Sequence, residues 1–178
     1  MSRVRIVGGE WKRRFVSFRA APGLRPTPDA VRETLFNWLG QDLSGLACLD
    51  LFAGTGVLGF EAASRGAAHV TLVERDAHVF AAVAASARAL GDNRLELIRS
   101  DALRFLPRAA RRYDVLFLDP PYGQGWIERV EPWLEAVAAP GARLYVEAER
   151  RLERVGAWNC IRHGRAGQVC YHLFEMDH

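Results

Sequence analysis

Four short apolar runs in this sequence are each followed by an acidic residue whose neighbours suggest ligand chemistry. The most specific is Asp119-Pro120-Pro121-Tyr122. The two prolines remove two backbone donors and fix the φ angles of the loop. The Asp119 carboxylate and the loop carbonyls are left as hydrogen-bond acceptors, and Tyr122 adds a flat ring on which a base could stack. This pattern favours a pocket that accepts N–H bonds from a planar group, with a rigid turn after a strand as the structural alternative.

A second stretch runs from Asp50 to Gly56 and contains a pair of glycines. Gly54 and Gly56 allow a tight turn and a close approach of the backbone to a ligand. The stretch is neither a GxGxxG dinucleotide motif nor a Walker A loop, which needs a Lys-Ser/Thr pair. Because the Asp50 carboxylate would repel a phosphate, the turn suits a cationic ligand, although a plain strand–helix joint would look the same.

Glu74 and Asp101 follow the next two apolar runs along the chain. An acid at the position of Glu74 can accept hydrogen bonds from both hydroxyls of a ribose. Asp101 could accept from an adenine amino group, with the backbone amide of Ala102 nearby. Each acid has an ordinary alternative, because Glu74 could be a surface or capping carboxylate and Asp101 could cap a helix.

The elements that must position these acids are short apolar strands alternating with helical segments. We expect strands at 46–52, 69–74, 95–99, 113–118 and 143–147, and helices at 29–39, 56–64, 76–90, 102–110 and 126–138. This alternation predicts a doubly wound α/β fold, in which a mostly parallel, Rossmann-like sheet is covered on both faces. The runs 157–163 and 168–175, joined by 164–167, predict an antiparallel C-terminal hairpin and bring the sheet to seven strands. Ligands bind beyond the carboxyl ends of parallel strands, so the four acids should share one edge.

The N-terminal segment is strongly basic. Residues 1–32 hold eight cations against Glu10 and Asp29, a net charge of +6. The runs 4–7 and 14–18 alternate apolar and polar residues on either side of Gly8-Gly9, which predicts a small β-hairpin. A basic arm of this kind suits nucleic acid, and a solvated basic segment is the alternative. We expect the contacts to come from Arg3, Arg5, Lys12, Arg13 and Arg14.

Two further expectations concern charged residues near helix ends. Asp29 should cap the helix at 29–39, after an irregular loop rich in proline. Arg108, Arg111 and Arg112 should form a solvated helix end, although they could extend the basic face.

Composition and length exclude several classes of protein. Hydrophobic residues make up 49% and charged residues 25% of the chain, as in an ordinary soluble domain. We expect a single domain at 1–178, with 1–28 as the basic hairpin and loop and 29–178 as the catalytic core. No apolar run approaches the roughly 20 residues of a membrane span and no secretory pattern is present, so we expect a cytoplasmic protein. Three scattered cysteines without metal-ligand spacing predict no metal, and the lack of an apolar seam predicts a monomer.

The four acidic motifs, in this order, resemble those of class I S-adenosylmethionine-dependent methyltransferases. Within that class an Asp-Pro-Pro-Tyr tetrapeptide marks enzymes that methylate exocyclic amino groups, on adenine N6, guanine N2 or glutamine amide. The chain is more specifically similar to the RsmD family, bacterial enzymes that methylate guanine N2 in 16S rRNA. This similarity lies in Arg5–Trp11, Gly23–Thr27, Val31–Leu39 and Ala166–Val169. Tyr122 stands where many members have Phe, and either ring can stack.

The resemblance implies S-adenosyl-L-methionine as cofactor and 16S rRNA as partner, within a small-subunit assembly intermediate. The implied cofactor-binding residues are Asp50, Phe52, Ala53, Gly54, Thr55, Gly56, Glu74, Arg75, Asp101, Ala102, Arg25 and Thr27. The implied catalytic residues are Asp119, Pro120, Pro121 and Tyr122, with the Asp119 carboxylate and Pro120 carbonyl accepting the N–H bonds of the target amino group. Whether Asp119 also removes a proton stays open. Arg25-Pro26-Thr27 would lie over the cofactor, although a rigid connection into the next helix explains this segment equally well.

Two other functions remain open at this point. The same tetrapeptide serves adenine-N6 methylation of DNA or RNA, but the chain has no large insert for target recognition. A cofactor-binding RNA scaffold without catalysis is the other alternative, and the intact chemistry of all four motifs argues against it.

Overall fold

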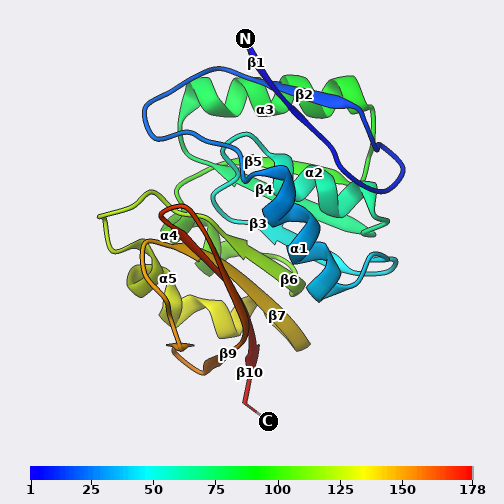
Figure 1. Ribbon diagram of the computed structural model, residues 1–178. Coiled ribbons are helices and arrows are strands. Elements are labelled where there is room, and N and C mark those ends of the chain that lie inside the picture. Colours follow the sequence, from blue (N-terminus) through cyan, green and yellow to red (C-terminus); the bar gives the residue numbers. More distant parts are fainter. Residues whose placement is uncertain (178) are drawn as a thin grey trace.

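The computed structural model describes residues 1–177, so the last residue of the predicted domain lies outside the described part (Figure 1). An eight-stranded sheet has the order β5-β4-β3-β6-β7-β10-β9-β8. Its parallel strands are β3 (Ala47–Asp50), β4 (His69–Glu74), β5 (Leu95–Arg99), β6 (Tyr113–Leu118) and β7 (Ala138–Ala148). The antiparallel ones are β8 (Arg154–Val155), β9 (Trp158–Ala166) and β10 (Val169–Met176). The predicted α/β fold with antiparallel C-terminal strands is confirmed, with the two-residue β8 as an eighth strand.

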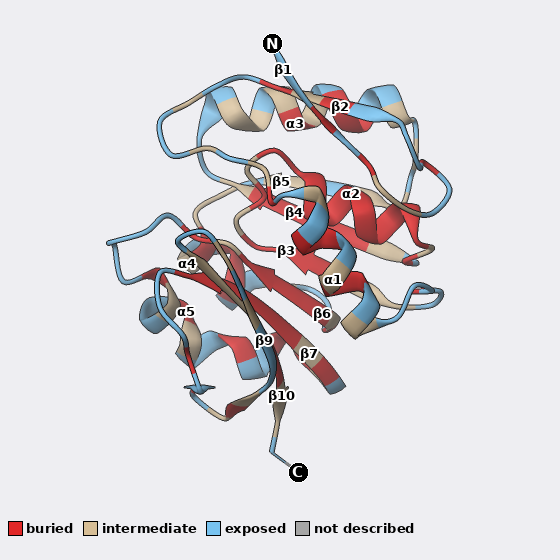
Figure 2. Cartoon of the chain, viewed as in Figure 1, coloured by how far each residue is buried: buried red, intermediate tan, exposed pale blue. Residues whose placement is uncertain are grey.

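Alternating side chains of the central strands divide the interior into two cores. On β6, Val115 and Phe117 point to one face and Leu116 and Leu118 to the other, as a strand's period of two requires. The first core lies under α1 (Asp29–Leu39), α2 (Val57–Ser64) and α3 (Ala77–Leu90). The second lies under α4 (Ala102–Phe105), η1 (Leu106–Arg108), α5 (Trp126–Leu134) and η2 (Glu135–Val137). Figure 2 shows the central strands and α2 buried, while α3 exposes its outer face.

The N-terminal hairpin forms, but not through the turn that the sequence suggests. β1 (Ser2–Arg5) pairs with β2 (Phe15–Phe18), with Arg5 opposite Phe15, so residues 6–14 make a wide loop. Gly9 has a φ of 75°, and a Cβ there would lie 2.0 Å from the Ser64 carbonyl oxygen. The glycine is needed because the loop lies directly on α2, and the expectation of a tight turn at Gly8-Gly9 was wrong.

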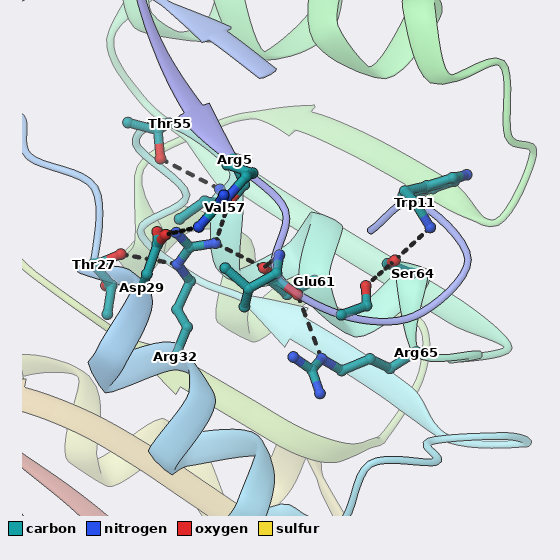
Figure 3. A network of polar contacts seen from close by, with 12 residues as sticks. Arg5, Trp11, Thr27, Asp29, Arg32, Thr55, Val57, Glu61, Ser64 and Arg65 are labelled. Carbon is teal, nitrogen blue, oxygen red and sulfur yellow. Dashed lines mark hydrogen bonds and ion pairs between the residues drawn. The ribbon is translucent and has the colours of Figure 1, made fainter. Parts of the chain in front are cut away.

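A buried polar network fastens this N-terminal segment to α2 (Figure 3). The Arg32 guanidinium is fully buried and lies 2.7 Å from Glu61 Oε1, which also accepts from the Val7 amide at 2.6 Å. Arg32 donates as well to the carbonyl oxygens of Thr27 (2.9 Å) and Arg5 (2.6 Å). Arg32 is therefore a structural residue, although its charge counted toward the predicted basic arm.

The same network explains two details of the neighbouring helices. Asp29 makes no capping hydrogen bond, contrary to expectation, because its carboxylate pairs with Arg5 and Arg32. On α2, the Ser64 hydroxyl donates to the Gly8 carbonyl (2.6 Å) and accepts from the Trp11 amide (2.8 Å). All eight residues of α2 are buried, since the N-terminal loop covers the face turned away from the sheet.

A second difference concerns Pro140-Gly141, which the sequence suggests as a stop between helix 126–138 and strand 143–147. The helical part ends at Val137, and β7 begins at Ala138, opposite Tyr113. The register then shifts before Val115 pairs with Arg143, so the proline and glycine fit within an irregular strand end. The C-terminal hairpin is confirmed, with Ala166 and Val169 as its last pair. None of the helices within residues 1–177 has the length and apolar character that a bilayer crossing requires.

Candidate active site

Asp50 ends β3 and is almost completely buried. Its Oδ2 accepts a hydrogen bond from the Gly59 amide in the first turns of α2, at 3.1 Å. Burial raises the pKa of Asp50 to about 7, against the lowering effect of the Gly59 bond, and the charges of Glu74 and Glu147 raise the pKa further. A negative charge at this position is therefore costly while no cation lies beside it.

The glycine turn after Asp50 is held against β4 by Glu74. The Glu74 carboxylate accepts from the Gly54 amide at 3.0 Å and from the Asp76 amide at 2.9 Å. A carboxylate has about four lone-pair positions, so Glu74 keeps acceptor capacity toward a ligand. Gly56 has a φ of 83° and a Cβ there would lie 2.5 Å from Val83, so both packing and backbone require glycine.

The other residues of the predicted cofactor set lie around this turn. Phe52 makes an edge-on contact with Trp126, with 5.4 Å between ring centroids. Asp101 caps α4 by accepting from the Leu103 amide at 2.8 Å, and the exposed Arg75 lies 3.8 Å from its carboxylate. The small residues of the set are largely enclosed: Ala53, Thr55, Gly56 and Ala102 are buried and Gly54 is half-buried.

Asp119 follows β6 and lies between the ends of two neighbouring strands. In the sheet, Phe117 of β6 pairs with Asp50 of β3 on one side, and Leu118 of β6 pairs with Val146 of β7 on the other. Burial raises the pKa of Asp119 well above its ordinary value, and the charges of Glu147 and Asp50 raise it further. Pro120 is buried, while Pro121 is exposed.

Tyr122 presents its ring beside this acidic centre. Its side chain is 44% exposed, so one ring surface is open to a partner. Partial burial raises the pKa of Tyr122 to about 12, and the nearby charges of Asp119 and Glu147 contribute. The hydroxyl is therefore neutral at physiological pH, and the ring remains an uncharged stacking surface.

Glu147, near the end of β7, is a site residue that the sequence analysis missed. It is 4% exposed, and its Oε2 accepts from the Thr27 hydroxyl at 2.6 Å. Burial raises the pKa of Glu147, while the Thr27 hydrogen bond lowers it. Among the described residues, the buried Tyr145 hydroxyl has no hydrogen-bond partner. Burial raises the pKa of Tyr145, and the charge of Glu147 raises it further. An acid at the end of a predicted strand was a signal that could have identified Glu147.

Asp50 and Glu147, which are buried, and Asp119, which is half-buried, thus form an acidic centre at the carboxyl ends of three adjacent strands. Within residues 1–177 none of the three makes an ion pair with Lys, Arg or His. No group of three metal-ligating side chains in that range is arranged to hold an ion. Enclosed carboxylates without a counter-charge favour a bound cation.

The segment before α1 covers part of this centre. Thr27 is buried against Glu147, and Leu24 lies close enough to the glycine turn that a Cβ on Gly54 would be 3.0 Å from its Cδ1. Arg25 is exposed between them. The structure therefore brings this N-terminal loop together with the ends of β3 and β7.

The predicted nucleic-acid residues lie apart from the acidic centre. Arg3 and Arg5 belong to the hairpin, whose strand β2 packs over α3 (Figure 1), and Lys12, Arg13 and Arg14 belong to the loop 6–14. Arg3, Lys12, Arg13 and Arg14 are exposed, and within residues 1–177 they make no ion pair. Arg5 differs, because its guanidinium lies 3.1 Å from Asp29. The Arg3 guanidinium lies 4.6 Å from the ring centroid of the exposed Phe15.

The protein family described as conserved hypothetical protein 95 matches residues 4–175. The chain belongs to this family. It is 40% identical to ribosomal RNA small subunit methyltransferase D of Escherichia coli K12, over 98% of this chain and 90% of that protein. The Haemophilus influenzae protein of the same name is 37% identical, over 97% and 93% of the two chains. The solved structure of yhhF from Escherichia coli has a TM-score of 0.88 at 39% identity and covers 99% of both chains.

Family membership confirms the resemblance to the RsmD family and the methyltransferase fold. It also confirms the assignment to the methyltransferases as an enzyme class.

Proposed function

We propose that this protein transfers a methyl group from S-adenosyl-L-methionine to the exocyclic N2 amino group of a guanine in 16S rRNA. The observation that carries the proposal is the acidic centre of the buried Asp50 and Glu147 and the half-buried Asp119, which has no cationic partner within residues 1–177. The relatives named for small-subunit ribosomal RNA support the choice of substrate. We propose that the protein acts as a cytoplasmic monomer on a small-subunit assembly intermediate.

The residues of the site fit the proposed cofactor. S-Adenosyl-L-methionine, when bound, supplies an activated methyl group on a sulfonium cation. Asp50 and its acidic neighbours would stabilise positive charge, and the free lone pairs of Glu74 would accept from the ribose hydroxyls. Asp101 and the Ala102 amide would hold the adenine edge, with the Arg25–Thr27 segment closing the site.

The chain's own contribution to transfer would be positioning and electrostatics. A guanine N2 lone pair is delocalised into the ring, so it must be held in line with the methyl group. The Asp119 carboxylate and the Pro120 carbonyl would accept the two N–H bonds and stabilise the positive charge that develops on nitrogen. The raised pKa of Asp119 brings it closer to that of an effective proton acceptor, while loss of the proton to water remains the other route.

The target base would have to leave its stack to reach this site. Tyr122, with its neutral and half-open ring, would stack on the extruded base. The basic N-terminal hairpin would hold phosphates and set the register of the RNA without reading its sequence.

The proposal is tested by incubating the protein with labelled methyl donor and 16S rRNA, free or in assembling small subunits, and identifying the modified nucleoside. We expect N2-methylguanosine. N6-methyladenosine would refute the guanine assignment, and tight cofactor binding without transfer to any RNA would identify a scaffold.

A matched pair of variants tests the role of Asp119. Asp119→Ala should abolish transfer while cofactor binding, measured by calorimetry, is largely retained, because Asp50 and Glu147 still supply negative charge for the cation. Asp92→Ala is the control, because Asp92 precedes β5, at the opposite end of that strand from Asp101, and its carboxylate pairs with Arg94. Unchanged turnover in Asp119→Ala would refute the proposed role.

A further inference from the structure

A concave surface lies on the edge strand β5, next to the adenine end of the proposed cofactor site. It has a volume of about 760 Å³ and is bounded by β5, by α4 with η1 and by the start of β6. Ser100 and Asp101 form the end of this groove nearest the acidic centre, and Tyr113 lies at the other end. We call it the β5 groove. The short helix leaves it open, because only seven residues, 102–108, are helical between β5 and β6.

Arginine dominates the lining of the β5 groove. Its cations are Arg75, Arg99, Arg104, Arg108 and Arg111, against the acids Glu96 and Asp101. All five arginines are exposed. Of these five arginines, only Arg75 makes an ion pair within residues 1–177, at 3.8 Å from Asp101. The acid Glu96 lies 3.4 Å from His69. Four guanidinium groups therefore face the groove without an acidic partner.

Unpaired guanidinium groups along a concave surface are typical of a phosphate-binding site. Each can donate two parallel hydrogen bonds to phosphate oxygens. Strand β5 rises about 3.3 Å per residue, so from Glu96 to Ser100 the groove follows roughly 13 Å of strand. That length exceeds what one phosphate group needs and accommodates successive phosphates of a nucleic-acid strand.

We propose that the β5 groove binds the phosphate backbone of the RNA substrate beyond the extruded base. This inference rests on the proposed function for the identity of the RNA. The groove begins at the edge of the sheet where the base would be methylated. The basic hairpin packs on α3, which covers the opposite face of β5, so the two basic surfaces lie on either side of this edge strand. An RNA strand that contacts both the basic hairpin and the β5 groove would cross the edge of β5. In the groove, Arg108 and Arg111 would be the RNA contacts farthest from the cofactor.

The test neutralises these two arginines and compares them with two arginines at the other side of the sheet. The groove variant is Arg108→Gln with Arg111→Gln. The control variant is Arg143→Gln with Arg154→Gln, which removes the same charge from β7 and β8. Both arginines make ion pairs near the surface, with Glu175 and Asp177, and also donate to backbone carbonyls, of Trp38 (3.2 Å) and Gly156 (2.9 Å). Direct binding of a 16S rRNA transcript and of an unrelated transcript of equal length is measured from 50 to 200 mM salt.

We expect the groove variant to bind both transcripts more weakly than the control variant does. Its slope of log K against log salt should flatten by about 1.4, because each lost phosphate contact of a single strand contributes ~0.7. In a methylation assay its KM for RNA should rise while kcat and cofactor affinity stay near those of the control. Equal RNA affinity and equal salt slope in the two variants would overturn the proposal and leave the groove for another anionic partner. RNA binding is measured directly, so this outcome is distinguishable from a wild-type protein that binds RNA but transfers no methyl group.

Discussion

The substitution Asp50→Asn should stabilise the protein without its cofactor at neutral pH. Burial moves the pKa of Asp50 from 3.8 to about 7 in the folded state. This difference corresponds to about 4 kcal/mol of unfolding free energy, at ~1.36 kcal/mol for each tenfold change in proton affinity. The asparagine carries no charge, so it avoids this cost, and its side-chain oxygen can still accept from the Gly59 amide.

The sign of the effect follows from proton linkage. Between pH 4 and pH 7 the folded wild type retains a proton on Asp50 that the unfolded chain has lost. Wild-type stability therefore falls as pH rises through this window, and Asp50→Asn removes that dependence. The advantage of the variant should be small near pH 4, grow with pH and level off above pH 7 at about 4 kcal/mol. A fixed cost of burying the amide changes the unfolding free energy of the variant by the same amount at every pH, so it does not alter how the difference from wild type depends on pH.

Urea unfolding of the cofactor-free protein at four pH values from 4.5 to 8 measures this effect. Asp92→Asn is the control. The hydrogen bond from Arg94 lowers the pKa of Asp92, so the charged carboxylate contributes its full stabilisation of the folded state at every pH above the ordinary pKa of an aspartate. The difference between this control and wild type should therefore stay level across the range. If the difference in unfolding free energy between Asp50→Asn and wild type also stays constant with pH, the argument that Asp50 is held at an electrostatic cost is refuted. The variant should also bind S-adenosyl-L-methionine more weakly, since the same charge would stabilise the cation.

Two further predictions concern the N-terminal network and the stacking ring. Glu61→Gln leaves the buried Arg32 without its main counter-charge, so the unfolding free energy should fall by about 3 kcal/mol or more. Glu128→Gln is the control, because its partner Arg150 is exposed, and it should change the unfolding free energy by less than about 1 kcal/mol. Equal urea midpoints for the two variants would contradict the structural role of Glu61. Tyr122→Ala should weaken binding of a single-stranded RNA by about 1–3 kcal/mol, while Tyr122→Phe should retain most of the affinity because the ring is kept. Fluorescence titration measures both, and equal losses would show that the hydroxyl and not the ring makes the contact.

Patterns that depend on local periodicity could be predicted from the sequence. The strands ending at Glu74, Arg99 and Leu118 begin and end where their apolar runs do. Parallel strands also align their carboxyl ends, which is why acids far apart in the sequence were expected at one edge. Glu147 follows the same rule, but it was taken only as the last residue of a strand, because the recognised motifs end at Tyr122.

The remaining features depend on contacts that local patterns do not contain. Gly8-Gly9 has the composition of a tight turn, yet the requirement for glycine comes from Ser64 on a helix more than fifty residues away. Arg32 resembles the other N-terminal cations in sequence, and only its partner Glu61 makes it a buried residue. In both cases tertiary packing decided the outcome over local preference.

The loop before α1 is held at two points, and this arrangement connects the stability of the N-terminal segment to the acidic centre. The Thr27 carbonyl accepts from Arg32 inside the Glu61 network, while the Thr27 hydroxyl donates to Glu147. Loosening the network at Glu61 should therefore weaken the hydrogen bond that lowers the pKa of Glu147. A Glu147 that is protonated more readily would offer less negative charge to a cation, so Glu61→Gln should reduce affinity for the methyl donor near neutral pH although Glu61 lies outside the site. Calorimetric titration of Glu61→Gln at pH 6.5 and pH 8.5 tests this, and a cofactor affinity equal to that of wild type at both values would show that Thr27 stays in place without the network.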